Sequence, residues 1–169
     1  MPFVLQPLPL GSITPNGWLS DQLGLMRDGL AGHEHEFYNY VAQSSWLGGS
    51  QEYSELNEGF PYWFNGLVPL AYSTNDARLK AQVHSAANYV LKHNTWKDGW
   101  IGPEEPSGRV FWARYPLCLG FVQLAEANST WTQPVVKALH KFTELMHTML
   151  NNGGEGFIYT PVSVPFLFS

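Results

Sequence analysis

Residues 57–72 read NEGFPYWFNGLVPLAY and form the densest aromatic segment of the chain. The segment places the carboxylate of Glu58 directly ahead of a run of flat rings that includes Tyr62 and Trp63. Rings that stack on an apolar face, beside a carboxylate that hydrogen-bonds or donates a proton, suit a sugar-like ligand. Aromatic stripes of this kind also pack in the cores of many proteins. The segment therefore predicts either a sugar platform or a core helix.

The composition around this segment predicts one folded domain that contacts something else. The 169 residues are 44% hydrophobic and 15% aromatic, which is enough to bury a real core. Charged residues make up only 14% of the chain, well below the usual level of roughly a quarter. A surface this poor in charge favours contact with a sugar, with a partner chain or with a further part of the same protein.

Charge and cysteine content exclude several classes of function. The net charge is −5, and no cluster of Lys and Arg stands in the sequence, so we expect no nucleic-acid partner. The single cysteine, Cys118, excludes a disulfide framework and a cysteine-based zinc site made by this chain alone. No apolar run is long enough to span a membrane. Residues 1–7 lack a basic start and are interrupted by prolines, so we expect no signal peptide there, and localisation stays open.

The spacing of apolar residues predicts five helices, at about residues 17–41, 61–72, 77–93, 110–127 and 133–150. Pro116 requires the fourth of these to begin near Arg114 or to kink. Residues 1–17 hold four prolines and predict an extended lead-in, residues 18–154 predict the helical domain, and the apolar, β-leaning residues 155–169 predict an irregular tail. The result is an all-α fold of stacked helical hairpins, either a compact open bundle or a piece of a larger barrel.

The first predicted helix carries a stripe that we expect to be buried. Its members are spaced by threes and fours: Leu19, Leu23, Met26, Leu30, His33, Phe37 and Tyr40. His33 on this stripe is then either a hydrogen-bonded core histidine or a residue that lines a central pocket. His33 and His35 stand two residues apart and not four, so they do not form the histidine pair of a helical zinc site.

Five motifs follow one another along the chain: WLSDQL at 18–23, DGLAGH at 28–33, EGFPYWFNGLVPLAY at 58–72, DARLK at 76–80 and DGWIGP at 98–103. Together they resemble the N-terminal part of the catalytic domain of glycoside hydrolase family 127, the β-L-arabinofuranosidase type, and most of all its fungal, secreted relatives. The resemblance covers roughly residues 5–150. The combination of the third and fifth motifs is its most specific part.

The resemblance implies an (α/α)6 barrel, of which this chain would supply about five of the twelve helices, with a central cavity for a furanose sugar. It implies retaining hydrolysis by a cysteine nucleophile with a glutamate acid/base and a zinc held by cysteines. Those groups lie later in the family's chain than the matched part, and Cys118 does not match them. We therefore expect no cofactor and no metal site in this chain. The resemblance also implies secretion.

The candidate site residues come from the opening segment and from two later positions. The candidate substrate-binding residues are His33, Glu58, Tyr62, Trp63, Trp100 and Arg114. Retaining hydrolysis by two carboxylates places them roughly 5 Å apart, and Glu58 with Asp98 or Glu104 is the weak candidate pair within this chain. The loop over residues 94–108 either contacts ligand or forms a Gly/Pro turn in which Trp100 plugs the end of the bundle.

Two classes of function remain open. One is a carbohydrate-active hydrolase of which this chain is a fragment or truncated isoform that is inactive alone. The other is a non-catalytic module that binds sugar or another protein. The expected partner is a carbohydrate, such as an arabinofuranose-containing glycan. A part-barrel would leave apolar helix faces uncovered, which leaves self-association open.

Overall fold

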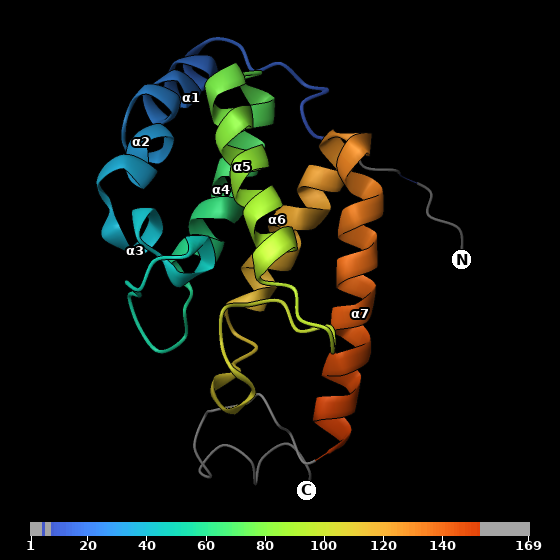
Figure 1. Cartoon of the computed structure of the whole chain (residues 1–169). Helices are drawn as coiled ribbons and strands as arrows, with labels where there is room; N and C mark the ends of the chain where they lie inside the picture. The colour runs from blue at the N-terminus through green and yellow to red at the C-terminus, as the bar shows by residue number, and fades with distance from the viewer. Residues whose placement is uncertain (1–4, 6–7, 153–169) are drawn as a thin grey trace, which may run out of the picture.

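The computed structural model describes residue 5 and residues 8–152, so the predicted tail at 155–169 lies outside the described part. The described part is all-α, as the sequence predicts, and its only β-feature is a single bridge between Thr95 and Ile101. The α-helices are α1 (Trp18–Asp28), α2 (Leu30–Phe37), α3 (Asn39–Ala42), α4 (Gly59–Ser73), α5 (Ala77–His93), α6 (Arg114–Ala127) and α7 (Thr132–Asn151). Short 3-10 helices occupy Ser45–Leu47, Pro106–Gly108 and Ser129–Trp131. Figure 1 shows α1–α3 on one side of α4–α6 and α7 on the other.

The α4–α5 hairpin forms the centre of the fold, close to where the sequence places it. The Asp76 side chain accepts a hydrogen bond from the Leu79 amide at 2.9 Å and so caps α5. Helix α5 buries one side of its surface, which consists of Leu79, Val83, Ala86, Ala87 and Val90. On α4, Phe60, Phe64 and Leu67 point into the same core.

Helix α6 packs closely along α4 because a glycine faces an aromatic ring. A Cβ added at Gly120 would lie 2.7 Å from Phe64 Cδ1, and the rings of Phe64 and Phe121 meet edge to face at 5.3 Å. Helix α6 begins at Arg114, so Pro116 falls in its first turn and causes no kink. Helix α7 buries Val135, Phe142 and Met149.

The first predicted helix is wrong as one continuous element, because it is broken into α1, α2 and α3. Gly29 and Tyr38 leave helical geometry, with ψ of −144° and 104°. The side chain of Arg78 on α5 donates hydrogen bonds to the carbonyls of Arg27 (3.0 Å) and Gly32 (2.7 Å) beside the first break. A long-range partner thus satisfies carbonyl groups at the interruption.

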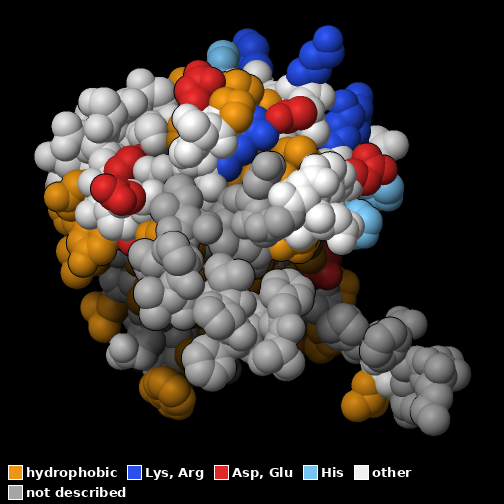
Figure 2. Space-filling view, turned by 90° about the horizontal axis from the view of Figure 1, so that it is seen from below, with side chains coloured by type: hydrophobic (Ala, Val, Ile, Leu, Met, Phe, Trp, Pro, Cys, Tyr) orange, Lys and Arg blue, Asp and Glu red, His pale blue; other side chains and the backbone are white. Residues whose placement is uncertain are grey.

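The buried stripe predicted for this region is also wrong. Helix α1 buries no residue, and Leu19, Met26, Leu30 and Phe37 are exposed, Leu30 by 74%. Of this stripe, Leu23 packs partly buried against the core. Figure 2 shows that hydrophobic side chains reach the surface at several places on the face seen from below.

Candidate functional site

A cleft opens where α2 ends and α4 begins. It has a volume of about 450 Å³ and is lined by Glu34, Tyr38, Tyr53, Glu58, Gly59, Tyr62 and Trp63. We call it the aromatic cleft. The fold therefore gathers Glu58, Tyr62 and Trp63 of the opening segment in one place, and adds residues from α2 and from the loop that precedes α4.

The rings of the cleft differ in how far they reach solvent. Tyr62 is 51% exposed and Tyr53 is also exposed, whereas Trp63 is only 8% exposed and lies beneath them. Tyr40 makes edge-to-face contacts with Tyr38 (5.3 Å) and with Tyr53 (5.7 Å). Tyr38 after α2, Tyr40 in α3 and Tyr53 in the loop are thus fixed against one another, and Tyr62 offers an exposed ring at the start of α4.

The two carboxylates of the cleft have different surroundings. Glu58 accepts hydrogen bonds from the Ser54 hydroxyl at 2.7 and 3.0 Å. The same hydroxyl accepts the Leu56 amide at 3.0 Å, which holds the turn before α4. Burial raises the pKa of Glu34 above its ordinary value, because desolvation penalises the charged form. Glu34 therefore retains its proton to a higher pH than an exposed glutamate.

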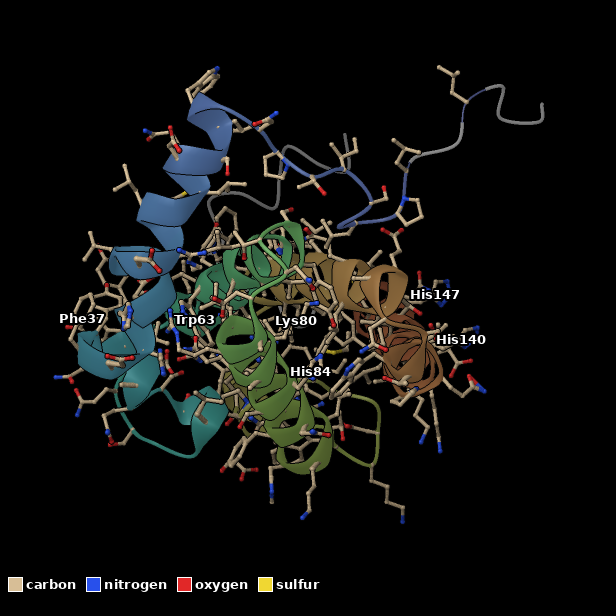
Figure 3. All side chains as sticks on the ribbon, turned by 90° about the horizontal axis from the view of Figure 1, so that it is seen from above. Phe37, Trp63, Lys80, His84, His140 and His147 are labelled. Carbon is tan, nitrogen blue, oxygen red and sulfur yellow. The ribbon has the colours of Figure 1, made fainter. Side chains whose placement is uncertain are left out.

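Trp63 separates the aromatic cleft from a second hollow on its other side, between α2 and α5. This hollow has a volume of about 650 Å³, and His35 and Gln82 are among its lining residues. The His35 ring stacks on Trp63 at 6.1 Å, and burial lowers the pKa of His35. Trp63 Nε1 and His35 Nδ1 are both buried without a hydrogen-bond partner within the described residues. Figure 3 shows Trp63 between the blue helices α1–α3 and the green helix α5.

His33 is not among the residues that line the cleft. Its Nδ1 lies 2.9 Å from Glu36 Oε1, and its side chain is 38% exposed. It is therefore not the hydrogen-bonded core histidine that is one of the two alternatives for its place on the expected stripe.

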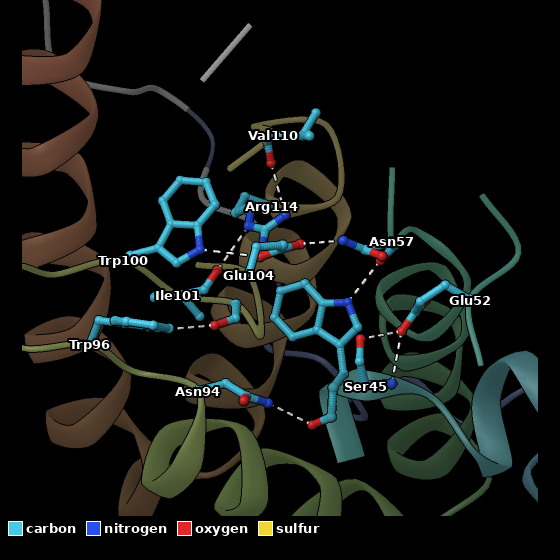
Figure 4. A network of polar contacts seen from close by, with 12 residues as sticks. Ser45, Glu52, Asn57, Asn94, Trp96, Trp100, Ile101, Glu104, Val110 and Arg114 are labelled. Carbon is cyan, nitrogen blue, oxygen red and sulfur yellow. Dashed lines mark hydrogen bonds and ion pairs between the residues drawn. The ribbon is translucent and has the colours of Figure 1, made fainter. Parts of the chain in front are cut away.

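Trp100, Glu104 and Arg114 lie together in the core, in a network that we call the Arg114 cluster (Figure 4). Arg114, 1% exposed, forms an ion pair with Glu104 and donates to the carbonyls of Ile101 and Val110, each at 2.8 Å. Glu104 also accepts Trp100 Nε1 at 3.2 Å and Asn57 Nδ2 at 2.6 Å.

The residues of the Arg114 cluster hold the core together. The guanidinium of Arg114 lies 4.3 Å from the centre of the Trp100 ring and 4.8 Å from that of Trp46. Trp100 is thus fully buried. Of the two alternatives for the loop over residues 94–108, ligand contact or a turn in which Trp100 fills the end of the bundle, its burial favours the second. Neither Trp100 nor Arg114 lines the aromatic cleft. Their polar groups form hydrogen bonds inside the protein.

Asp98 lies outside the cleft as well. It pairs with Arg109 at 2.7 Å and accepts the Trp100 amide at 3.1 Å. Although burial opposes the effect, the hydrogen bond from Arg109 holds the pKa of Asp98 below its usual range. The structure therefore does not bring Asp98 or Glu104 into the cleft beside Glu58, and the acidic residue that it brings there is Glu34.

The described residues offer no sign of metal or thiol chemistry. Among them no group of three or more His, Cys, Asp or Glu side chains is placed to hold a metal ion. Cys118 is largely buried, and burial raises its pKa to about 11, so its thiol is protonated at neutral pH. Within the same part of the chain, no helix is long and apolar enough to cross a membrane.

Comparison with known proteins adds no relative, since no family model, no curated protein and no solved structure matches this chain. Sequence reasoning missed three residues of the aromatic cleft, Glu34, Tyr38 and Tyr53. The only signals that could have pointed to them are the tyrosines at 38, 40 and 53, which flank the loop before α4.

Proposed function

We propose that the chain binds carbohydrate in the aromatic cleft, as the N-terminal part of a β-L-arabinofuranosidase-type glycoside hydrolase barrel. The observation that carries this proposal is the meeting of exposed tyrosine rings with two carboxylates in one cleft of about 450 Å³. This volume falls within the range of small-molecule sites, roughly 300–1,000 Å³. The motif combination at residues 58–72 and 98–103 supports the same class of ligand.

The residues of the cleft suit the two sides of a sugar ring. The Tyr53 and Tyr62 rings offer apolar faces for carbon-bound hydrogens, and the Glu58 carboxylate accepts hydrogen bonds from hydroxyl groups. Glu34, with its raised pKa, supplies a donor when protonated and an acceptor when ionised. The cleft thus combines stacking with both kinds of polar contact.

For this chain the proposed role is binding and positioning of the sugar, without turnover. The nucleophile that the resemblance implies is a cysteine, and the pKa of Cys118, raised to about 11, disfavours the thiolate that such a step needs. Release of arabinose from an aryl β-L-arabinofuranoside tests this directly. We expect no release by the wild-type chain, and release that is lost in Glu58→Gln would instead make the chain a hydrolase by itself.

Binding is tested by calorimetric titration with arabinofuranose-containing oligosaccharides. Tyr62 and Tyr115 provide a matched pair, because each is 51% exposed at the start of a helix but only Tyr62 lines the cleft. We expect Tyr62→Ala to weaken binding about 5–30-fold, equivalent to about 1–2 kcal/mol, and Tyr115→Ala to leave it within about twofold of wild type. Equal losses in the two variants, or no binding by the wild type, would contradict the proposal.

A second candidate function, contact with further protein, is favoured by the outer face of α6. Tyr115, Leu119 and Val122 are exposed along it, while Leu117, Phe121 and Leu124 are buried on the opposite face. A helix that is apolar on both sides is normally buried on both. We propose that this face of α6 is covered in a larger barrel and that it drives self-association of the isolated chain. Analytical ultracentrifugation of Leu119→Glu should then show more monomer than the wild type at equal concentration.

A further inference from the structure

A further groove lies between the C-terminal end of α5, the loop after it and α7, on the side of the molecule opposite to the aromatic cleft. It has a volume of about 560 Å³, and its lining includes Lys97, Lys137 and Lys141 around Leu91, Trp96 and Ala138. We call it the lysine groove. Figure 1 shows α7 on the side of the fold opposite to α2 and α3, so the groove is separate from the aromatic cleft.

The groove gathers positive charge on an acidic protein. Three of the nine Lys and Arg residues of a chain with net charge −5 line this one hollow. Lys137 and Lys141 stand one turn apart on α7, a rise of about 6 Å along the helix. On the face that Figure 2 shows, Lys and Arg side chains lie along one edge of the molecule, with Asp and Glu side chains among them. The sequence scatters these lysines, and the fold brings them together.

No carboxylate among the described residues pairs with the three lysines. The acidic residues nearest in the chain are engaged elsewhere, since Asp98 pairs with Arg109 at 2.7 Å and Glu144 lies 3.4 Å from His140. No carboxylate lines the groove. The three lysines therefore give the groove a positive charge that no ion pair with a described carboxylate offsets, and an anionic ligand would complement it.

Behind the groove, Arg109 and Asp98 form an ion pair, so the net positive charge of the groove comes from its lysines. Arg109 is only 6% exposed, and its guanidinium lies 5.4 Å from the centre of the Trp96 ring. Its Nη1 donates to Asp98, but its Nε and Nη2 are buried without a hydrogen-bond partner within the described residues. The Trp96 ring itself is held in place, because its Nε1 donates to the Gly102 carbonyl at 2.8 Å.

We infer that the lysine groove binds an acidic polysaccharide, a chain of sugar units that carry carboxylate groups. Lys137 and Lys141, one turn apart on α7, provide point charges for carboxylates on successive sugar units. Leu91, Ala138 and the half-buried Trp96 ring provide an apolar surface for the faces of the sugar rings. A nucleic acid fits less well, because three lysines on an acidic chain offer few phosphate contacts and Trp96 is the one aromatic ring of the lining.

This site is independent of the aromatic cleft, so its test does not depend on the proposed function. The probe is an oligogalacturonate of fixed length, titrated into the protein at low salt and followed by calorimetry. A neutral oligosaccharide of the same length and a single-stranded oligonucleotide serve as comparison ligands. The expected result is binding of the oligogalacturonate only, with an affinity that falls as salt is raised.

Single-charge variants locate the binding. We expect Lys97→Ala, Lys137→Ala and Lys141→Ala each to weaken oligogalacturonate binding about fivefold. Lys80→Ala removes the same charge near the opposite end of α5, about 20 Å away along the helix axis, and should change the affinity less than twofold. Tyr62→Ala, in the aromatic cleft, should leave this affinity unchanged. Circular dichroism confirms that each variant is folded.

Several outcomes would overturn the inference. Absence of oligogalacturonate binding would do so at once. An equal effect of Lys80→Ala would show general attraction to positive charge and not a site. Equal binding of the neutral oligosaccharide would remove the role of the carboxylates, and equal binding of the oligonucleotide through the same lysines would make the groove a general polyanion surface.

Discussion

Replacing Glu104 with Gln should destabilise the protein strongly while leaving sugar binding intact. The substitution removes the carboxylate that faces Arg114 in the core and leaves a guanidinium that is only 1% exposed without its counter-charge. Breaking a buried ion pair from one side costs about 3–5 kcal/mol, because the remaining charge stays desolvated. Domains of this kind have a total free energy of unfolding of about 5–15 kcal/mol, so the loss is a large share of the whole.

The expected size of the effect can be expressed as a shift in the urea midpoint. With a dependence on urea of about 2 kcal/mol per molar, a loss of 3–5 kcal/mol lowers the midpoint by about 1.5–2.5 M. Arg114→Met should cost more than Glu104→Gln, because it also leaves the Ile101 and Val110 carbonyls without their donor. The double variant removes both charges, so its cost should be clearly smaller than the sum of the two single costs.

Urea unfolding followed by tryptophan fluorescence and by far-ultraviolet circular dichroism measures all three variants. Calorimetric titration of the folded Glu104→Gln protein then reports its sugar affinity. A midpoint within about 0.5 M of wild type would refute the reasoning, as would single costs that simply add. If Glu104→Gln instead lost sugar affinity at unchanged stability, Glu104 and Arg114 would belong to the ligand site, as the sequence predicts.

The remaining predictions concern packing, capping and pH. Gly120→Ala should cost about 1–3 kcal/mol of stability, because the new methyl group meets the Phe64 ring and the Asn65 backbone, whereas Gly66→Ala, with open space around it, should be neutral or stabilising by up to about 1 kcal/mol; urea unfolding compares the two. Asp76→Ala removes the cap of α5 and should cost about 1 kcal/mol, measured in the same way. Burial lowers the pKa of His35 and of His84 from 6.5, so the stability that they contribute is present above that pH and is lost as pH falls through their folded-state values. The urea midpoint should therefore fall from pH 7 to pH 5, and His84→Gln should reduce this fall; an unchanged slope would contradict the assignment of His84.

The parts of the fold that the sequence predicts well are those held by local chemistry. Helix α5 begins and ends where its cap residue and its apolar period place it, from Ala77 to His93. Helix α6 begins at Arg114 because Pro116 is tolerated in a first turn. In both cases one or two residues within the element decide the boundary.

The first predicted helix shows why other parts could not be predicted. Its apolar spacing continues across Gly29 and Tyr38, so periodicity alone gives no sign of either break. The carbonyls at the first break find their donor in Arg78, about fifty residues later in the chain. The aromatic cleft depends on the same breaks, because they bring Glu34 and Tyr38 to the start of α4.

The segment at residues 57–72 shows that the two interpretations of its rings apply to different faces of one helix. Successive residues on α4 are separated by about 100° around the axis, so Phe60 and Phe64 point into the core while Tyr62 points outward. Trp63 lies between these faces and forms the floor of the cleft. The core rings hold the helix against α6, and this rigid support is what fixes Tyr62 and Glu58 relative to the tyrosines of the preceding loop. A ligand platform of this kind needs the packed face as much as the open one, since a ring on a mobile segment would lose much of its stacking free energy to ordering.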